Sequence, residues 1–244
     1  MKAFQFNTTP GIRFGSDYSV STAEEVSKKL GKKILFVTDP GLVKIGLHEK
    51  TITELQKYSE IIIFDNVEAD PSIKTLMDCV QQGRDFDATG VIGFGGGSSM
   101  DVSKLTALLI GSNENIHEAW GVANAKGPRL PLALYPTTSG TGSEVTPISI
   151  ITQEDLEKKG VSSPIILPDF AILDPILTLG LPPHITAATG IDAMVHAIES
   201  YASKSVNNNL ISKTLAKEAL KLLGGSIRQA VLNGKDIEAR SNML

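Results

Sequence analysis

Short runs of apolar and β-branched residues recur through residue 173, and each has the length of a buried strand. The runs are Ile34–Val37, Ile61–Phe64, Val91–Phe94, Leu130–Tyr135, Ile148–Ile151 and Phe170–Leu173. Amphipathic segments of helical length lie beside several of these runs, at Thr22–Leu30, Pro71–Gln82 and Ser98–Ile110. Strands that alternate with helices predict βαβ units around a buried parallel sheet.

The pattern changes after about residue 181, where Pro182 and Pro183 form a pair of breakers. Beyond them the periodicity is helical only, at Thr189–Ser203, Asn208–Leu223 and from Asp236 onward. We therefore expect an α/β domain over residues 1–181 and an all-helical segment over 182–244. No stop signal follows the last helical segment, which we interpret as a chain that ends inside an element.

Composition and charge exclude several classes of partner. The net charge is −4 and acidic and basic residues are interspersed, so no basic face for nucleic acid is expected. Cys79 is the single cysteine of the sequence, which rules out disulfides within the chain and favours a reducing compartment. The first residues lack a signal-peptide core, and no apolar run approaches the roughly 18 residues of a membrane span. We expect a soluble cytoplasmic protein without membrane partners.

A glycine-rich turn, Gly95–Ser98, joins the run Val91–Phe94 to the helical segment that follows it. A helix start offers unpaired N–H groups and the positive end of the helix dipole, which favour phosphate. Glycines let a pyrophosphate approach the backbone, and Ser98 can cap the helix or bond a phosphate oxygen. The turn departs from the G-x-G-x-x-G fingerprint because the third position falls on Ser98. A tight turn that merely needs glycine is the alternative.

Three polar features can complete a dinucleotide site. Asp39 follows the run Ile34–Val37 at its carboxyl end, where it can accept both hydroxyls of a ribose and repel a 2′-phosphate. It can equally serve as a turn former. The segment Pro136–Glu144 carries five hydroxyls and two glycines, which suit either a polar ligand or an ordinary surface loop. Lys158, from its spacing alone, is a solvated surface lysine.

Asp192 and His196 are spaced four residues apart in a helical segment, which places both side chains on one face. A carboxylate oxygen and an imidazole nitrogen suit Fe, Zn, Mn or Co. Two alternatives compete, because Thr189–Asp192 resembles a capping box and His196 can be a core histidine. Catalytic metals usually have three or more protein ligands, so the pair alone is an incomplete site.

Four ordered motifs resemble the iron-containing (group III) alcohol dehydrogenases. They are Gly95–Ser98 with Asp101 and Lys104, then Pro136–Thr146, Leu167–Pro175 and Ala188–Glu199. The resemblance implies a Rossmann-like dinucleotide-binding domain followed by the start of an all-helical metal-binding domain. Two further histidines of the family come later in the helical domain than Leu244. We therefore expect a chain that lacks the C-terminal third of the family pattern and holds its metal weakly.

The resemblance also assigns roles to single residues. It implies that Asp39 binds the adenosine ribose, which favours NAD over NADP, and that Lys158 reaches the nicotinamide ribose. The remaining residues that it implies for the cofactor are Gly96, Gly97, Ser98, Asp101, Thr137, Thr138, Ser139, Thr141, Leu177 and Leu181, with Ser143 nearby. Asp70 stands where the family usually has asparagine or another small polar residue.

For the metal, the resemblance implies Asp192 and His196 as ligands, with iron as the first choice and zinc as the second. The implied activity is hydride transfer between a small primary alcohol or its aldehyde and NAD, in a homo-oligomer such as a dimer. No catalytic side chain or proton relay is assigned. The alternatives are a nucleotide-binding module without catalysis, a polyol (glycerol-type) dehydrogenase, and a dehydroquinate-synthase-like lyase. The lyase is disfavoured because Ser98, not lysine, follows the three glycines.

Overall fold

The computed structural model describes residues 3–244, and these residues cluster into two compact units. The first, the α/β unit, comprises Thr8–Pro136 and Ser143–Asp174. The second, the helical unit, comprises 3–7, Thr137–Gly142 and Pro175–Leu244. Each unit has its own internal packing, and each carries some of the residues that the sequence singles out.

The α/β unit is built on a parallel sheet, in which the described strands follow the order β1-β9-β6-β4-β2-β3. Their bounds are β1 (Gly11–Phe14), β2 (Lys33–Val37), β3 (Glu60–Phe64), β4 (Gly90–Gly95), β6 (Leu132–Pro136) and β9 (Phe170–Leu173). The strands β4 and β6 are buried along their whole length, as continuous apolar runs covered on both faces should be. The α/β fold expected from the sequence is confirmed.

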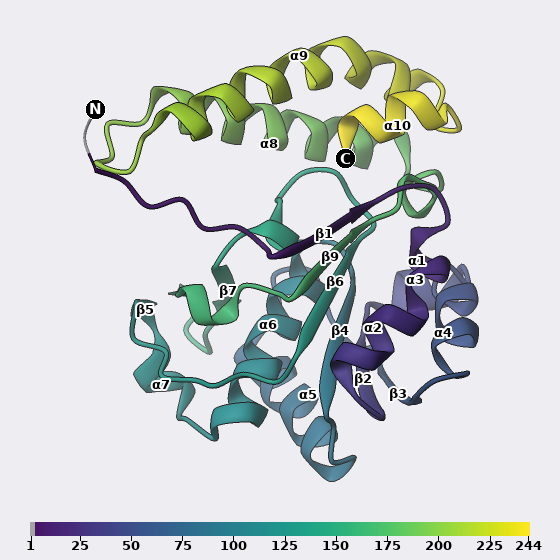
Figure 1. The fold of residues 1–244 in the computed structure, drawn as a ribbon, viewed down its shortest axis with the longest axis vertical. Helices are drawn as coiled ribbons and strands as arrows, with labels where there is room; N and C mark the ends of the chain where they lie inside the picture. The colour runs from purple at the N-terminus through teal and green to yellow at the C-terminus, as the bar shows by residue number, and fades with distance from the viewer. Residues whose placement is uncertain (1–2) are drawn as a thin grey trace. The chain divides into compact units, whose positions relative to one another are not determined.

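Helices cover both faces of this sheet (Figure 1). The helices of the α/β unit are α1 (Tyr18–Ser21), α2 (Ala23–Leu30), α3 (Pro40–Lys44), α4 (Glu49–Leu55), α5 (Ile73–Asp85), α6 (Gly97–Ser112) and α7 (Ile116–Ala119). Most of α6 is buried, and its Leu105 and Leu108 join Val91 and Leu134 of the sheet in one core. On the opposite face, the ring of Phe94 lies 5.3 Å from that of Phe36 and 6.1 Å from that of Tyr135.

A second, smaller sheet contains β5 (Gly121–Val122), β8 (Lys158–Ser162) and β7 (Ile148–Thr152). Here the structure corrects the sequence expectation, because the run Ile148–Ile151 does not join the parallel sheet. It forms β7, which pairs antiparallel with β8 and places Thr152 opposite Lys158. The strand β8 begins with charged residues, so its apolar content does not reveal it.

The strand order reverses around β2 in the large sheet. The chain passes from β2 to β3 on one side and then to β4 on the other side of β2. All three strands are parallel, so their carboxyl ends meet at one edge, and the loops after β2 and β4 diverge there. Such a switch point is where open α/β sheets bind ligands. Asp39 follows β2 and Gly95–Ser98 ends β4, so both lie at this point.

The helical unit contains α8 (Pro183–Ala202), α9 (Leu210–Leu232) and α10 (Ile237–Met243), which pack together as Figure 1 shows. Gly190 permits the close contact, since a Cβ there would lie 2.6 Å from Met243 Cε and 2.9 Å from Ile227 Cδ1. Both long helices extend beyond the segments expected from periodicity. In particular, α8 begins at Pro183, because a proline in the first turn lacks only an N–H that has no helical partner.

Three short 3₁₀ turns complete the described elements, at Ser143–Val145, Pro164–Ile166 and Pro175–Thr178. Among residues 3–244, no helix combines the length and the apolarity required to cross a bilayer.

Candidate functional site

The glycine turn has a backbone that only glycine adopts without strain. Gly95 has φ +151°, and a Cβ on it would lie 2.7 Å from Ser99 Oγ. Gly96 is the N-cap of α6, and no side chain caps the helix. The helix starts at Gly97, so Ser98 lies in the first turn and does not cap it. The first N–H groups of α6 are therefore left for a ligand or for solvent.

Asp39 lies beside this turn, and one of its two carboxylate oxygens already accepts a hydrogen bond within the protein. It is the N-cap of α3, and its Oδ1 accepts a hydrogen bond from Leu42 N at 3.0 Å. Its Oδ2 would lie 3.5 Å from a Cβ on Gly95, so the carboxylate and the glycine turn are direct neighbours. The turn-forming and ligand-binding interpretations of Asp39 are thus compatible, because one oxygen caps the helix and the other faces the turn.

Lys158 forms an ion pair with Asp70 instead of standing alone in solvent. Its Nζ donates to Asp70 Oδ1 at 2.6 Å, and both side chains are more than half exposed. Asp70 adopts the left-handed region with φ 53°. Thr152, opposite Lys158 in the small sheet, donates through N to Pro71 O at 2.9 Å and through Oγ1 to Asp70 O at 3.2 Å. The β7–β8 pair and the loop after β3 are therefore joined at Lys158.

Asp101, which the sequence groups with the cofactor residues, directs its carboxylate into the protein. Its Oδ1 accepts from Ser143 Oγ at 2.6 Å, and its Oδ2 accepts from Ile150 N at 2.9 Å. Its backbone oxygen accepts from Ser149 Oγ at 2.9 Å. The side chain belongs to the helix of the glycine turn, but the contacts described for it are with protein.

Lys104, one turn further along α6, is fully buried. Its Nζ donates to Ser143 Oγ and to Ile148 O, each at 2.7 Å, and lies 3.8 Å from Asp101 Oδ1. Burial lowers the pKa of Lys104 to about 8, and burial raises the pKa of Asp101 and of Glu144. The sequence assigned Lys104 no role, although a lysine in the apolar helical segment Ser98–Ile110 is a signal of a buried polar contact.

In the helical unit, the segment Thr137–Gly142 contacts α8. A Cβ on Gly140 would lie 2.9 Å from Thr189 Cβ and 3.1 Å from Thr189 O. Thr137 and Ser139 are buried, Thr138 is half-buried, and Thr141 is exposed. Leu177 is buried, and the backbone oxygen of Leu181 accepts from Arg240 Nη2 at 3.1 Å. The hydroxyl-rich segment thus packs one helical turn before Asp192.

Asp192 and His196 share one face of α8, with Asp192 Oδ1 3.8 Å from His196 Nε2. Both side chains are about half exposed, so His196 is not a core histidine. The capping-box interpretation of Asp192 is also wrong, because α8 starts at Pro183. An oxygen and a nitrogen donor at this spacing fit a divalent transition metal. Within the described part of the chain, no group of three or more His, Cys, Asp or Glu side chains is placed to hold one.

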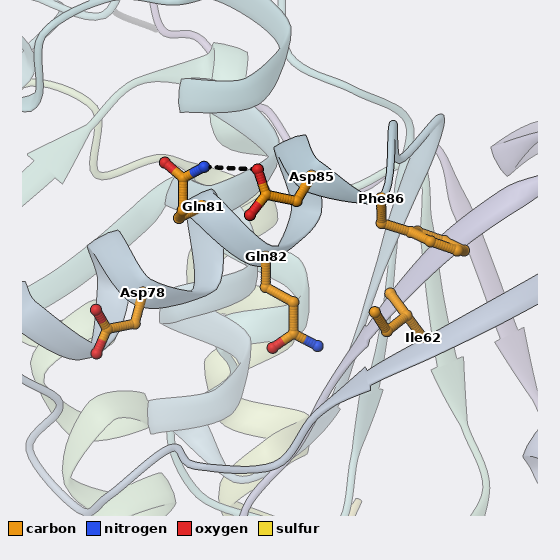
Figure 2. A pocket seen from close by; sticks show the side chains of 6 residues that line it. All are labelled: Ile62, Asp78, Gln81, Gln82, Asp85 and Phe86. Atoms are coloured by element: carbon orange, nitrogen blue, oxygen red, sulfur yellow. Dashed lines mark hydrogen bonds between the residues drawn. The ribbon is translucent and has the colours of Figure 1, made fainter.

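A surface pocket between α5 and β3 contains no comparable chemistry (Figure 2). Its Gln82 Nε2 donates to Ile63 O at 2.8 Å, and Gln81 Nε2 donates to Asp85 Oδ1 at 2.7 Å. These polar groups satisfy each other and the edge strand, so we assign the pocket no ligand.

Comparison with known families decides the classification. Residues 9–175 match the family model of iron-containing alcohol dehydrogenases. Residues 186–244 match the model for the C-terminal part of the Fe-containing alcohol dehydrogenase family. The chain belongs to the iron-containing alcohol dehydrogenase family. The resemblance inferred from its motifs is confirmed, and relatives of this family are oxidoreductases acting on alcohols or aldehydes.

Curated relatives of this family align with nearly the whole chain. The sulfoacetaldehyde reductase of Bilophila wadsworthia (strain 3_1_6) is 40% identical over 245 residues, which cover 99% of this chain and 62% of that protein. The long-chain-alcohol dehydrogenase 1 of Geobacillus thermodenitrificans (strain NG80-2) is 44% identical over 221 residues, which cover 88% and 55%. The chain therefore spans less than two thirds of the length of these relatives.

Solved structures of the family have the same fold. A 1,3-propanediol oxidoreductase superimposes with a TM-score of 0.94 at 34% identity, covering 99% of this chain and 63% of that one. The sulfoacetaldehyde reductase from Bifidobacterium kashiwanohense, solved in complex with NAD⁺, superimposes with a TM-score of 0.90 at 30% identity. That superposition covers 100% of this chain and 64% of the reductase.

Lys104 should make stability depend on pH in an alkaline window. Because burial lowers its pKa from 10.5 to about 8, the unfolded chain binds a proton between these values that the folded chain has released. Linkage then makes the Lys104 contribution to the free energy of unfolding rise with pH, by up to about 1 kcal/mol per pH unit. Urea unfolding from about pH 8 to about pH 9.5 should reveal this rise relative to the control Asp101→Asn/Lys104→Met. Equal pH slopes for the two proteins would contradict the assignment.

Proposed function

We propose that the chain carries the cofactor-binding machinery of an NAD-dependent, metal-dependent dehydrogenase for small primary alcohols and aldehydes. The observation that supports this most directly is the proximity of Asp39 to the glycine turn at the switch point of the sheet. An acidic side chain beside a helix N-terminus offers an acceptor for ribose hydroxyls and donors for the pyrophosphate within one short span.

Each cofactor residue then has a task that its chemistry allows. Asp39 Oδ2 accepts hydrogen bonds from the adenosine ribose hydroxyls. The backbone N–H groups of Gly96, Gly97 and Ser98 donate hydrogen bonds to the pyrophosphate. Lys158 donates to the nicotinamide ribose while Asp70 holds it. The remaining proposed cofactor residues lie in the helical unit, namely Thr137, Thr138, Ser139, Thr141, Leu177 and Leu181.

Asp192 and His196 are proposed as two ligands of a divalent metal, with iron as the family implies and zinc as the alternative. When bound, the metal supplies Lewis-acid chemistry toward an alcohol or aldehyde oxygen, and NAD exchanges hydride with the adjacent carbon. The helix α8 contributes by holding both donors at a fixed spacing.

The substrate class follows from what the names of the relatives share. These names refer to sulfoacetaldehyde, long-chain alcohols, choline and 1,3-propanediol. The molecules differ in charge and length, but each has a terminal alcohol or aldehyde carbon. We therefore propose this group as the reacting centre, with a polyol such as a diol as one form of the substrate. A nucleotide-binding module without catalysis is the alternative that the two-ligand metal pair favours.

Asp39 should set the preference for NAD over NADP. Replacing Asp39 with Ser removes the charge but keeps an oxygen that can cap α3, so the fold should persist. Fluorescence titration should show weaker NADH binding, by about tenfold, because charge-assisted hydrogen bonds to the ribose are lost. The same variant should bind NADPH more tightly than wild type does.

A matched control separates this effect from helix capping. Asp39→Ala removes both the charge and the cap, and should destabilise the chain by about 1 kcal/mol beyond Asp39→Ser while matching its change in selectivity. An NADH/NADPH ratio that stays at the wild-type value in both variants would sink the ribose assignment.

The proposed metal pair should bind metal weakly, because two protein ligands leave most of the coordination sphere to water. Calorimetric titration with Zn²⁺ should give a low-affinity event that His196→Ala abolishes. His184→Ala is the control, since His184 is exposed in the first turn of the same helix. Retention of a full equivalent of metal through desalting would contradict the incomplete site, and an unchanged titration of His196→Ala would contradict the ligand.

We also propose that the chain forms a homodimer through β1. This strand is an edge of the large sheet, and its Ile12 and Phe14 side chains are 45% and 50% exposed. Light scattering should give twice the 26.0 kDa chain mass for wild type and the single mass for Phe14→Lys. Ile45→Lys, at an apolar residue elsewhere that is 63% exposed, should remain dimeric. A monomeric wild type would refute this interface.

A further inference from the structure

One turn of α6 is bonded to three consecutive residues of β7. Lys104 Nζ donates to Ile148 O at 2.7 Å, Ser149 Oγ donates to Asp101 O at 2.9 Å, and Ile150 N donates to Asp101 Oδ2 at 2.9 Å. We call these two α6 residues, Asp101 and Lys104, the α6–β7 clamp. Both lie just after the glycine turn, so the clamp connects that turn directly to the small sheet.

Only one face of β7 is buried in the protein core, so apolar packing constrains the strand on that face alone. Ser149 and Ile151 are fully buried, whereas Ile148 and Ile150 are 43% and 46% exposed. A slip of one residue would exchange these two sets and separate Ile148 O and Ile150 N from their partners on α6. The clamp therefore fixes the register of β7 through hydrogen bonds that only one register satisfies.

The register of β7 continues to Lys158. Thr152 ends β7, pairs with Lys158 across the hairpin, and bonds to the backbone of Pro71 and Asp70. Asp70 in turn accepts from Lys158 Nζ at 2.6 Å. A path of hydrogen bonds and of the β7 backbone between Ile150 and Thr152 thus leads from the helix of the glycine turn to the amine of Lys158, within the α/β unit alone.

We propose that Asp101 and Lys104 are positioning residues that set Lys158 at the correct place relative to the glycine turn for binding the dinucleotide. This inference rests on the proposed function, because it assumes that Lys158 contacts the cofactor. It also gives a physical reason for a costly feature. A buried lysine–carboxylate pair is often no more stable than apolar residues of similar volume, so its value lies in fixing one geometry.

The test is a double-mutant cycle on NADH binding, read by fluorescence titration. We expect Lys158→Ala to weaken binding about tenfold and Asp101→Asn to weaken it several-fold, because Lys158 is displaced. In Asp101→Asn/Lys158→Ala, binding should be within about twofold of Lys158→Ala alone, since the displaced amine is already absent. If the loss of NADH affinity in the double variant equals the product of the two single losses, the proposal is overturned.

Asp169→Asn is the matched control for simple loosening of the fold. Asp169 is also a partly buried carboxylate that accepts a backbone N–H, from Leu132 at 2.9 Å, and pairs with a cation, Arg129, at 2.7 Å. It precedes β9 of the large sheet, and its contacts with Arg129, Leu132 and Lys29 involve neither β7 nor β8. Asp169→Asn should lower NADH affinity only slightly. In Asp169→Asn/Lys158→Ala, the loss of affinity should equal the product of the two single losses. Equal coupling for Asp169 and Asp101 would also overturn the proposal.

Two further measurements keep the test decisive if Asp101→Asn folds poorly. Asp101→Asn/Lys104→Met removes both charges together, so it avoids an unpaired buried charge while still losing the bonds to β7. It should show the same coupling to Lys158. Hydrogen exchange should accelerate at the β7 amides in this variant and not in Asp169→Asn; unchanged exchange would refute the clamp. Failure of wild type to bind NADH would overturn the proposed function, whereas binding without coupling would overturn only the positioning role.

Discussion

The reversal of strand order around β2 is the constraint on which the candidate site depends. Because β3 and β4 flank β2 and all three are parallel, the loops after β2 and β4 leave the same edge in different directions. Asp39 and Gly95 are far apart in sequence, yet this arrangement makes them neighbours. The strand β4 ends at Gly95 and α6 begins at Gly97, so the first N–H groups of α6 follow directly after the residue that Asp39 approaches. The strand order, and not one local motif, therefore brings the carboxylate of Asp39 close to the glycine turn at the start of α6.

Buried polar contacts position the rest of the candidate site. The free-energy cost of burying a charged group explains why each such group has several partners. A lysine amine removed from water is stabilised only by nearby acceptors and carboxylates. Lys104 has Ser143 Oγ and Ile148 O within hydrogen-bond distance and Asp101 close by. The exposed pair of Lys158 and Asp70 contributes little to stability, because solvent screens it. The buried contacts therefore hold the framework, while the exposed pair remains available to a ligand.

The sequence predicted those features that local pattern determines. Apolar runs revealed β2, β4 and β6, which are buried along most or all of their length, and also β9 and the edge strand β3, whose Ile63 is 36% exposed. The charged start of β8 concealed it, since Lys158 and Lys159 interrupt the apolar content of the strand although it pairs with β7 in a local hairpin. The Pro182–Pro183 pair predicts a break, but α8 begins at Pro183 because a first-turn proline is compatible with a helix. The candidate site residues follow from residue type and motif, but the contact of Lys104 with Ile148 spans 44 residues and has no local signature.

The two halves of the proposed chemistry depend on the structure to different degrees. Asp39, the glycine turn, the α6–β7 clamp and Lys158 are connected by contacts inside the α/β unit. Their geometry is therefore determined by a sheet, two helices and several buried hydrogen bonds at once. Asp192 and His196 depend on a single helix, which fixes their mutual spacing but supplies no third donor among the described residues. The contacts among Asp39, the glycine turn and Lys158 should consequently tolerate perturbation of α8 better than metal binding does, because cooperative contacts constrain the first and one helical repeat constrains the second.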